Sequence, residues 1–356
     1  MKIRAPEYYK NFQCIADKCN DTCCKQWEID IDKKTTLFYQ NIDGEFGKML
    51  KENISSTLPN HFILDKSNKC PFLTKNNLCS IYIKLGEENL CEICKKHPRY
   101  YEWFKDFKEC GIGLCCEEAA RIILSQDRPF KTYEINISPE PYDSYNEKLY
   151  SFLSKIRDTI ILYLEDKSVP FNVKLFNILC YSEILQKRID NNDFDCLKNL
   201  DRIPIFSRNT TKTDLKNIIY FYSKLEPLNK EWIEYLKKST SKIDKYSYTF
   251  TSFKTNINVY LQNLAIYFIW RYFLKGVFDK DILSKINFMV VSLIVINFLF
   301  WCKYTEKNNL LFDDCVNIVK DYSKEIEYCE NNLNSLFNAS YENYFFSIDY
   351  LKGLLL

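Results

Sequence analysis

Crowding of cysteine is the feature that most constrains how this 356-residue chain can fold. Eleven of its sixteen cysteines lie between Cys14 and Cys116, and the other five are scattered singly through the remainder. An isolated free cysteine usually behaves as a small buried hydrophobic residue, but eleven within about a hundred residues are typical of metal binding. The first third of the chain is therefore predicted to be a small, irregular, cysteine-rich domain organised by metal.

Charge and glycine content exclude several other classes of protein. The formal net charge is +2, from 49 basic and 47 acidic residues, so no broad basic face for nucleic acid is predicted and no nucleic-acid partner is expected. Glycines number only seven, which argues against a glycine-rich nucleotide fold. Residues 1–10 lack the apolar stretch of a secretory signal, so we expect a cytoplasmic protein whose thiols stay reduced.

The clustered cysteines fall into three successive segments. Their sequences are CIADKCNDTCCKQW, KCPFLTKNNLCSIYIKLGEENLCEICKKHPR and CCEEAARIIL. Thiolates suit zinc, copper(I) and iron–sulfur clusters, and the spacing of Cys91 and Cys94 lets one loop present two sulfurs to one centre. The adjacent Cys23 and Cys24 should point in different directions, so that one can bind metal while the other packs or serves a second site.

The spacing favours iron over zinc. Structural zinc sites usually show two CxxC pairs, whereas this chain has only the pair at Cys91 and Cys94. We therefore predict an iron–sulfur cluster, with zinc as the alternative. The two histidines, His61 and His97, cannot make a three-histidine catalytic zinc site, and His97 is expected to form structural hydrogen bonds.

The remainder of the chain has the periodicity of helices. Three prolines between Asp127 and Asp143 predict a linker, which divides the chain into a cysteine-rich domain at 1–126, a linker at 127–143 and a helical domain at 144–356. Ser144 and Glu147 form a capping-box pattern ahead of the first helix. Further helices are expected over 173–189, 214–225, 230–237, 258–274, 280–301 and 310–336. The predicted class is mainly α, with an all-α second domain.

One apolar run, residues 286–302, raises the question of a membrane. It holds seventeen uncharged residues, below the ~20 that usually span a bilayer, and Asn287, Ser292 and Asn297 interrupt it. We predict a buried core helix there. Peripheral membrane association through this region stays open, as does self-association into a homo-oligomer.

The three cysteine segments together resemble the flagellin lysine N-methylase family, the FliB type. The resemblance is strongest over residues 12–126 and continues through INVYLQNLAIYFIWRYFLKGV and DYSKEIEYCENNL. It implies a cytoplasmic methyltransferase that uses S-adenosylmethionine, acts on lysines of flagellin and needs a four-iron, four-sulfur cluster. The cysteines that match the family pattern, and that the resemblance implies as metal ligands, are Cys14, Cys19, Cys23, Cys24, Cys70, Cys79, Cys91, Cys94 and Cys116.

The sequence departs from the family pattern around its third cysteine segment. Cys110 and Cys115 are additional cysteines, and Glu117 stands where the family usually has proline after the last cysteine. Which cysteine of this segment binds the metal is therefore left undecided by the sequence.

The chemistry of methyl transfer is less constrained than the metal. No glycine-rich turn marks a cofactor pocket, and the CxxxCxxC motif of radical enzymes is incomplete because Gln26 stands at its third place. A cluster would then either be structural or bind the cofactor. Arg99 and Arg121 could hold the cofactor carboxylate by paired hydrogen bonds, and no catalytic residue is assigned. The alternative function is a non-catalytic zinc- or iron-chelating protein with a helical interaction domain.

Overall fold

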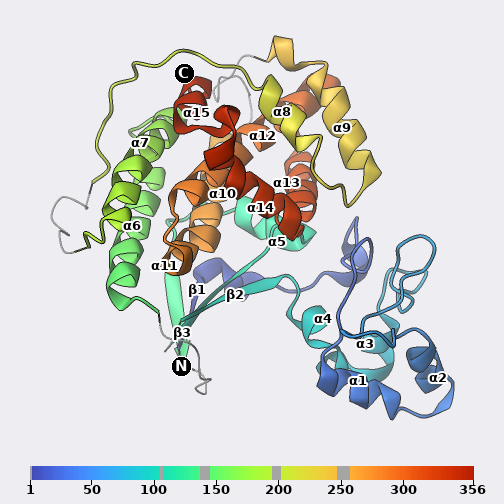
Figure 1. Ribbon diagram of the computed structural model, residues 1–356. Helices are drawn as coiled ribbons and strands as arrows, with labels where there is room; N and C mark the ends of the chain where they lie inside the picture. Colours follow the sequence, from blue (N-terminus) through green and yellow to red (C-terminus); the bar gives the residue numbers. More distant parts are fainter. Residues whose placement is uncertain (1, 105–106, 137–144, 195–201, 247–256) are drawn as a thin grey trace.

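The computed structural model describes residues 2–104, 107–136, 145–194, 202–246 and 257–356. A large helical body and a smaller cysteine-rich lobe are joined by the extended strands β2 and β3 (Figure 1). The predicted class, mainly α with an irregular cysteine-rich N-terminal part, is confirmed. A small β-sheet was not predicted.

The helical body follows the predicted periodicity closely. Its helices are α6 (Glu147–Glu165), α7 (Phe171–Asp190), α8 (Lys216–Tyr222), α9 (Lys230–Thr240), α10 (Ile257–Tyr272), α11 (Gly276–Asp279), α12 (Leu283–Lys307), α13 (Phe312–Ile326), α14 (Glu330–Glu342) and α15 (Ile348–Leu354). Helix α5 (Glu117–Leu124) packs into the same body against α10 and α13.

Helix α12 is the core of this body. It is long and apolar enough to cross a membrane by length and composition, with a mean hydropathy of 2.0, but 94% of that apolar window is buried inside the protein. Neighbouring helices α7, α10, α13 and α14 surround it. The predicted buried core helix is thus observed, because helices rather than lipid cover its apolar surface.

Two predicted helix boundaries differ from the structure. The side chain of Asn146 caps α6 by accepting a hydrogen bond from the Leu149 amide at 3.0 Å, whereas Ser144, the predicted cap, lies outside the described residues. The single helix expected over 310–336 is two helices. The side-chain amide of Asn332 donates a hydrogen bond to the backbone carbonyl of Glu325 at 2.8 Å. This bond gives a partner to a carbonyl group at the end of α13 that the helix itself cannot pair, so the helix can end there.

The sheet joins segments that are far apart in the sequence. Its strands are β1 (Lys2–Pro6), β2 (Arg99–Phe104), β3 (Phe107–Ile112) and β4 (Thr132–Asn136), in the order β2-β3-β1-β4. Strand β1 is parallel to β3 and antiparallel to β4. Strand β4 therefore occupies part of the predicted linker 127–143, and residues 137–143 lie outside the described residues.

The cysteine-rich lobe has an apolar core of its own. Its short helices are η2 (Ala16–Lys18), α1 (Lys33–Gln40), α2 (Gly44–Glu52), α3 (Ser80–Leu85), η3 (Glu87–Asn89) and α4 (Glu92–Lys96). The core contains Tyr39, Leu50, Phe62 and Phe72 together with two of the thiols. Phe104, Ile112 and α5 belong instead to the core of the helical body. Along the chain, the boundary between the two cores therefore lies between α4 and β2.

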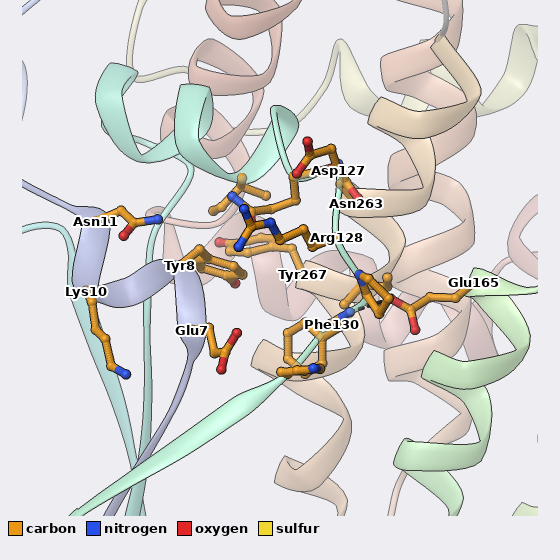
Figure 2. Close-up of a pocket in the computed structure, with 15 residues that line it drawn as sticks. Glu7, Tyr8, Lys10, Asn11, Asp127, Arg128, Phe130, Glu165, Asn263 and Tyr267 are labelled. Atoms are coloured by element: carbon orange, nitrogen blue, oxygen red, sulfur yellow. Dashed lines mark hydrogen bonds between the residues drawn. The ribbon is translucent and has the colours of Figure 1, made fainter.

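A cavity of about 530 Å³ opens at the edge of the helical body (Figure 2). Its walls come from η1 (Glu7–Asn11), the connection between α5 and β4, and α10. The backbone amide of Glu7 donates to the carbonyl of Lys131 at 2.9 Å, which holds two of these walls together. The cavity therefore forms only because the pairing of β1 with β4 places η1 next to the segment that follows α5.

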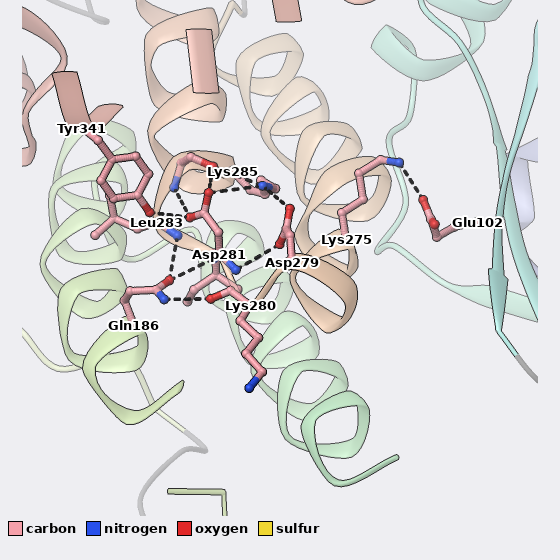
Figure 3. A network of polar contacts seen from close by, with 11 residues as sticks. Glu102, Gln186, Lys275, Asp279, Lys280, Asp281, Leu283, Lys285 and Tyr341 are labelled. Carbon is pink, nitrogen blue, oxygen red and sulfur yellow. Dashed lines mark hydrogen bonds and ion pairs between the residues drawn. The ribbon is translucent and has the colours of Figure 1, made fainter. Parts of the chain in front are cut away.

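A polar network fixes the entry into α12 and the position of the sheet (Figure 3). The carboxylate of Asp281 accepts from the amide of Ser284 at 3.0 Å and from the hydroxyl of Tyr341 at 2.7 Å. The buried Lys285 ammonium pairs with Asp279 at 2.6 Å. Lys275 reaches Glu102 of β2 at 2.7 Å, so a charged contact connects the helical body to the sheet.

Stability should depend on pH through Glu325. Burial raises the pKa of this carboxyl from its ordinary value of 4.5 to about 7, although it accepts hydrogen bonds from the amides of Leu228 and Asn229. A raised carboxyl pKa means that its contribution to stability is full below pH 4.5 and is lost as the pH rises through about 7. Glu325→Gln should flatten the fall in melting temperature between pH 5 and 7.5, as measured by thermal denaturation.

Glu231→Gln, an exposed change on α9, is the matched control and should leave the pH profile as in the parent protein. A Glu325→Gln profile that falls as steeply as the parent profile would contradict the assignment.

Candidate metal centre

Four thiols from two of the three cysteine segments form the first thiol group: Cys14, Cys19, Cys23 and Cys116. Burial, followed by the nearby Cys116 thiol, raises the pKa of Cys19 to about 12. Burial also raises the pKa of Cys116 to about 11, with a contribution from Cys14. Hydrogen bonding to Cys24 and burial raise the pKa of Cys23, again with contributions from Cys116 and Cys14. The four thiols therefore lie near enough to interact electrostatically.

The loop that carries Cys19 and Cys23 is fastened to the helical body. The buried carboxylate of Glu117, the first residue of α5, accepts from the backbone amide of Asn20 at 2.9 Å and from its side-chain amide at 3.1 Å. The carboxylate of Asp21 pairs with Lys320 at 3.4 Å and also with Lys324, both on α13. Glu117, which stands where the family usually has proline, thus has a structural role in holding this loop.

Five thiols form the second thiol group: Cys24, Cys70, Cys79, Cys91 and Cys94. Burial raises the pKa of Cys70 to about 12, with contributions from Cys24, Cys79 and Cys91. Cys91 and Cys94 hydrogen-bond each other, as their spacing predicts. All five pack against or belong to the apolar core of the lobe.

Three of the thiols stand at helix N-termini. Cys79, Cys91 and Cys116 are the N-cap residues of α3, α4 and α5. Burial raises the pKa of Cys79 and Cys116, and backbone amides of the following turn oppose this rise. The pKa of Cys91 is lowered by its hydrogen bond to Cys94, with a further contribution from such amides. Unpaired amides at a helix N-terminus stabilise negative charge. The positions are thus suited to thiolates, although burial opposes ionisation until a cation is present.

Cys23 and Cys24 connect the two thiol groups. Their thiols hydrogen-bond each other, yet Cys23 interacts further with Cys14 and Cys116, while Cys24 interacts with the thiols of the second group. Cys94 of the second group interacts with Cys23 as well as with Cys24. Cys23 therefore interacts with members of both groups, and the two neighbouring thiols do not point apart as predicted.

The donor set fits an iron–sulfur cluster. A zinc ion with Zn–S bonds of about 2.3 Å would hold its sulfurs about 3.8 Å apart. Among the described residues, no three thiol sulfurs lie within 4.8 Å of one another. Three ligand atoms that do lie this close belong to Glu28, Asp30 and His61. Four cysteines are the usual ligands of a four-iron cluster, and four cysteines can also hold zinc.

The remaining cysteines belong to neither group, although Cys115 interacts with its neighbour Cys116. Cys110 is buried on β3, and Cys115 is buried beside Tyr328, consistent with their absence from the family pattern. Cys180, Cys302 and Cys315 are buried singly in the helical body, and Cys329 is half-buried. Cys196 lies outside the described residues.

His97 does not make the predicted structural hydrogen bond through Nε2. That atom is buried and has no hydrogen-bond partner among the described residues. Burial, followed by the nearby charges of Lys324 and Arg99, lowers the pKa of His97 to about 4, so the ring is neutral at physiological pH. It packs beside Trp27, with ring centres 5.8 Å apart.

The two arginines predicted to hold the cofactor have different surroundings. Arg121 pairs with Asp313 at 2.6 Å, Glu117 at 3.4 Å and Glu118 at 3.8 Å. Arg99 stacks over Tyr9 and Phe12, at 5.7 Å and 5.0 Å from their ring centres. Neither lines the cavity of Figure 2.

The helical body matches the family of the FliB lysine N-methylase C-terminal domain over residues 157–354. The chain is 27% identical over 137 residues to the flagellar biosynthetic protein FliU of Salmonella muenchen. The aligned region covers 35% of this chain and 77% of that protein. It is 25% identical over 156 residues to a lysine-N-methylase of Salmonella typhimurium, covering 40% of this chain and 37% of that protein. No solved structure matches the chain.

A lysine-N-methylase of Salmonella choleraesuis is 26% identical over 154 residues, with the same coverage of 40% and 37%. The match thus spans little more than a third of the length of these two lysine-N-methylases. The family match, in contrast, extends from α6 to α15 and covers more than half of the chain. The chain belongs to the FliB lysine N-methylase family.

Proposed function

We propose that this protein transfers methyl groups from S-adenosylmethionine to lysine side chains of flagellin, and that its thiol groups hold an iron–sulfur cluster. The family match over α6–α15 is the observation that carries the proposal. Two curated relatives are named lysine-N-methylases, and a third is named a flagellar biosynthetic protein. These names support a methyltransferase of the flagellar system, which acts in the cytoplasm, where flagellin is made.

The reaction sets a clear chemical requirement. The lysine nitrogen must be neutral to attack, but its ordinary pKa of about 10.4 keeps it protonated at neutral pH. In a polar transfer the nitrogen forms a bond to the methyl carbon, the carbon–sulfur bond breaks, and its electron pair goes to sulfur. Before this attack, the lysine ammonium must lose one proton to a carboxylate or to water. The protein must therefore orient the donor, accept a proton and exclude competing water.

The first thiol group would hold a four-iron cluster, and the second would hold a further metal or cluster. Bound there, the cluster would supply structural cross-links between the lobe and α5, together with the capacity for electron transfer. Glu117 and the lysines of α13 fasten the loop between the ligands. These residues would keep Cys19 and Cys23 in place relative to Cys116.

The proposal is tested by incubating anaerobically purified, metal-loaded protein with flagellin and isotopically labelled S-adenosylmethionine. Label on flagellin lysines, found by mass spectrometry, is the expected result. Omitting either the protein or the donor should abolish it. Unlabelled flagellin in the presence of fully metallated, folded protein would overturn the proposed activity.

A non-catalytic metal-chelating protein is the second candidate. The observation that favours it is the separate apolar core of the cysteine-rich lobe, which contains Cys70 and Cys91. A chelator of this kind would bind metal without a change in flagellin and without affinity for S-adenosylmethionine. The labelling experiment therefore distinguishes the two functions.

A further inference from the structure

The cavity of Figure 2 is distinct from both thiol groups and has a charged mouth over a buried floor. Glu7, Asp127 and Arg128 are exposed at the mouth. Ile123 and Tyr267, each 1% exposed, form the floor. Its volume of about 530 Å³ falls within the range of ~300–1,000 Å³ typical of small-molecule sites. The cavity therefore has the size and composition of a site for a polar small molecule.

Tyr8 supplies an unsatisfied polar group in the wall of this cavity. Its side chain is 6% exposed, and its hydroxyl has no hydrogen-bond partner among the described residues. The hydroxyl of Tyr267, in contrast, donates to Glu327 at 2.9 Å. Leaving a buried hydroxyl unpaired costs free energy. A bound molecule would remove that cost by accepting a hydrogen bond from Tyr8.

The charges of the mouth have both signs, and several are unengaged. Arg128 makes no ion pair with a described residue, and it lines the cavity together with Tyr8 and Tyr267 (Figure 2). Glu165, in contrast, accepts from the amide of Phe130, and Lys10 lies over the ring of Tyr133. Glu7 and Asp127 likewise make no ion pair with a described residue. An arginine and two carboxylates at one mouth suit a ligand that carries a carboxylate and an ammonium group.

We propose that this cavity binds the amino-acid end of S-adenosylmethionine, an inference that rests on the proposed function. Arg128 pairs with the carboxylate of the cofactor, and Glu7 and Asp127 face its ammonium group. The Tyr8 hydroxyl donates a hydrogen bond to the bound molecule. The cavity supplies the cofactor site that no glycine-rich turn marks in the sequence.

This placement separates the cofactor's amino-acid group from the first thiol group. Cys116 caps the N-terminus of α5, whereas Ile123 and Gln126, at its other end, line the cavity. The eight residues of α5 span about 12 Å. Held at the far end of α5, the amino-acid group is not a ligand of iron at Cys116. Methyl transfer then proceeds as the polar displacement written above, and the cluster is structural.

Calorimetric titration of full-length, metal-loaded protein with S-adenosylmethionine tests the site. Arg128→Ala should weaken binding about tenfold or more, because a charge-assisted pair is lost. Arg202→Ala removes an exposed arginine that does not line the cavity, and it should bind as the parent protein does. Tyr8→Phe should weaken binding severalfold while the free protein melts at the same or a higher temperature, because an unpaired buried hydroxyl is removed.

The result that would overturn the site is parental affinity in both Arg128→Ala and Tyr8→Phe, in preparations that still methylate flagellin. That result would leave the proposed function standing. Absence of both cofactor binding and methylation in the parent protein would overturn the site and the function together. The paramagnetic resonance spectrum of the reduced cluster should stay unchanged at saturating cofactor, and a perturbed spectrum would contradict the placement.

Discussion

Alanine at Cys19 or Cys116 is expected to remove the metal of the first thiol group, while alanine at Cys91 or Cys94 removes the metal of the second. The reason is that Cys19 and Cys116 interact with each other, whereas Cys91 and Cys94 form a hydrogen-bonded pair elsewhere in the lobe. Each substitution should leave the other centre largely loaded. Metal and sulfide content of anaerobically reconstituted protein, measured by mass spectrometry and colorimetry, is the readout.

Cys180→Ala and Cys329→Ala serve as controls, because these cysteines lie singly in the helical body. Both should retain the full metal content of the parent protein. Equal metal content in the ligand variants and the controls would reject the assignment. Loss of all metal from every ligand variant would show that the two thiol groups form one centre.

A second large effect is expected from the buried ion pair between Arg157 of α6 and Glu109 of β3. The two groups make paired contacts of 2.5 Å and 2.8 Å, and their side chains are 1% and 4% exposed. Removing one partner leaves a buried charge, which typically costs about 3–5 kcal/mol. Glu109→Leu should therefore destabilise the metal-loaded protein by about this amount, as measured by denaturant titration.

The double variant Glu109→Leu, Arg157→Met tests the cause. It removes both charges and keeps apolar volume, so it should recover most of the stability lost in Glu109→Leu. Arg4, 3.5 Å from Glu109, retains its partner Glu134 at 3.0 Å. A double variant as unstable as the single variant would show that packing, rather than an unpaired charge, accounts for the loss.

The long helices could be predicted because their apolar residues recur with helical spacing. Helix α7, observed at Phe171–Asp190, differs by one or two residues from the expected 173–189. The break between α13 and α14 could not be predicted in the same way. It depends on Asn332 and Glu325, whose contact is visible only after the chain has folded.

The sheet escaped prediction because its pairing is nonlocal. Strand β1 alternates charged and apolar residues over only five positions, and Arg4 finds its partners more than a hundred residues away, at Glu109 and Glu134. No local pattern reports such pairing. The cavity was missed for the same reason, since the sheet brings η1 beside the segment that follows α5.

The clustering of the predicted cysteines could be foreseen from the sequence, but not their division into two thiol groups. Spacing identifies Cys91 and Cys94 as a pair, and the structure shows them in contact. Spacing cannot show that Cys116 meets Cys14 and Cys19, because α5 approaches them only in the folded chain. The family resemblance, read mainly from cysteine motifs, is confirmed by a match to the helical body instead.

The most direct test of the central claim is Mössbauer spectroscopy of anaerobically purified protein enriched in iron-57. The account predicts brown protein whose iron gives the spectrum of a thiolate-ligated four-iron cluster, lost in Cys19→Ala and retained in Cys180→Ala. Colourless protein that holds stoichiometric zinc after anaerobic reconstitution, and that shows no cluster iron, would contradict it.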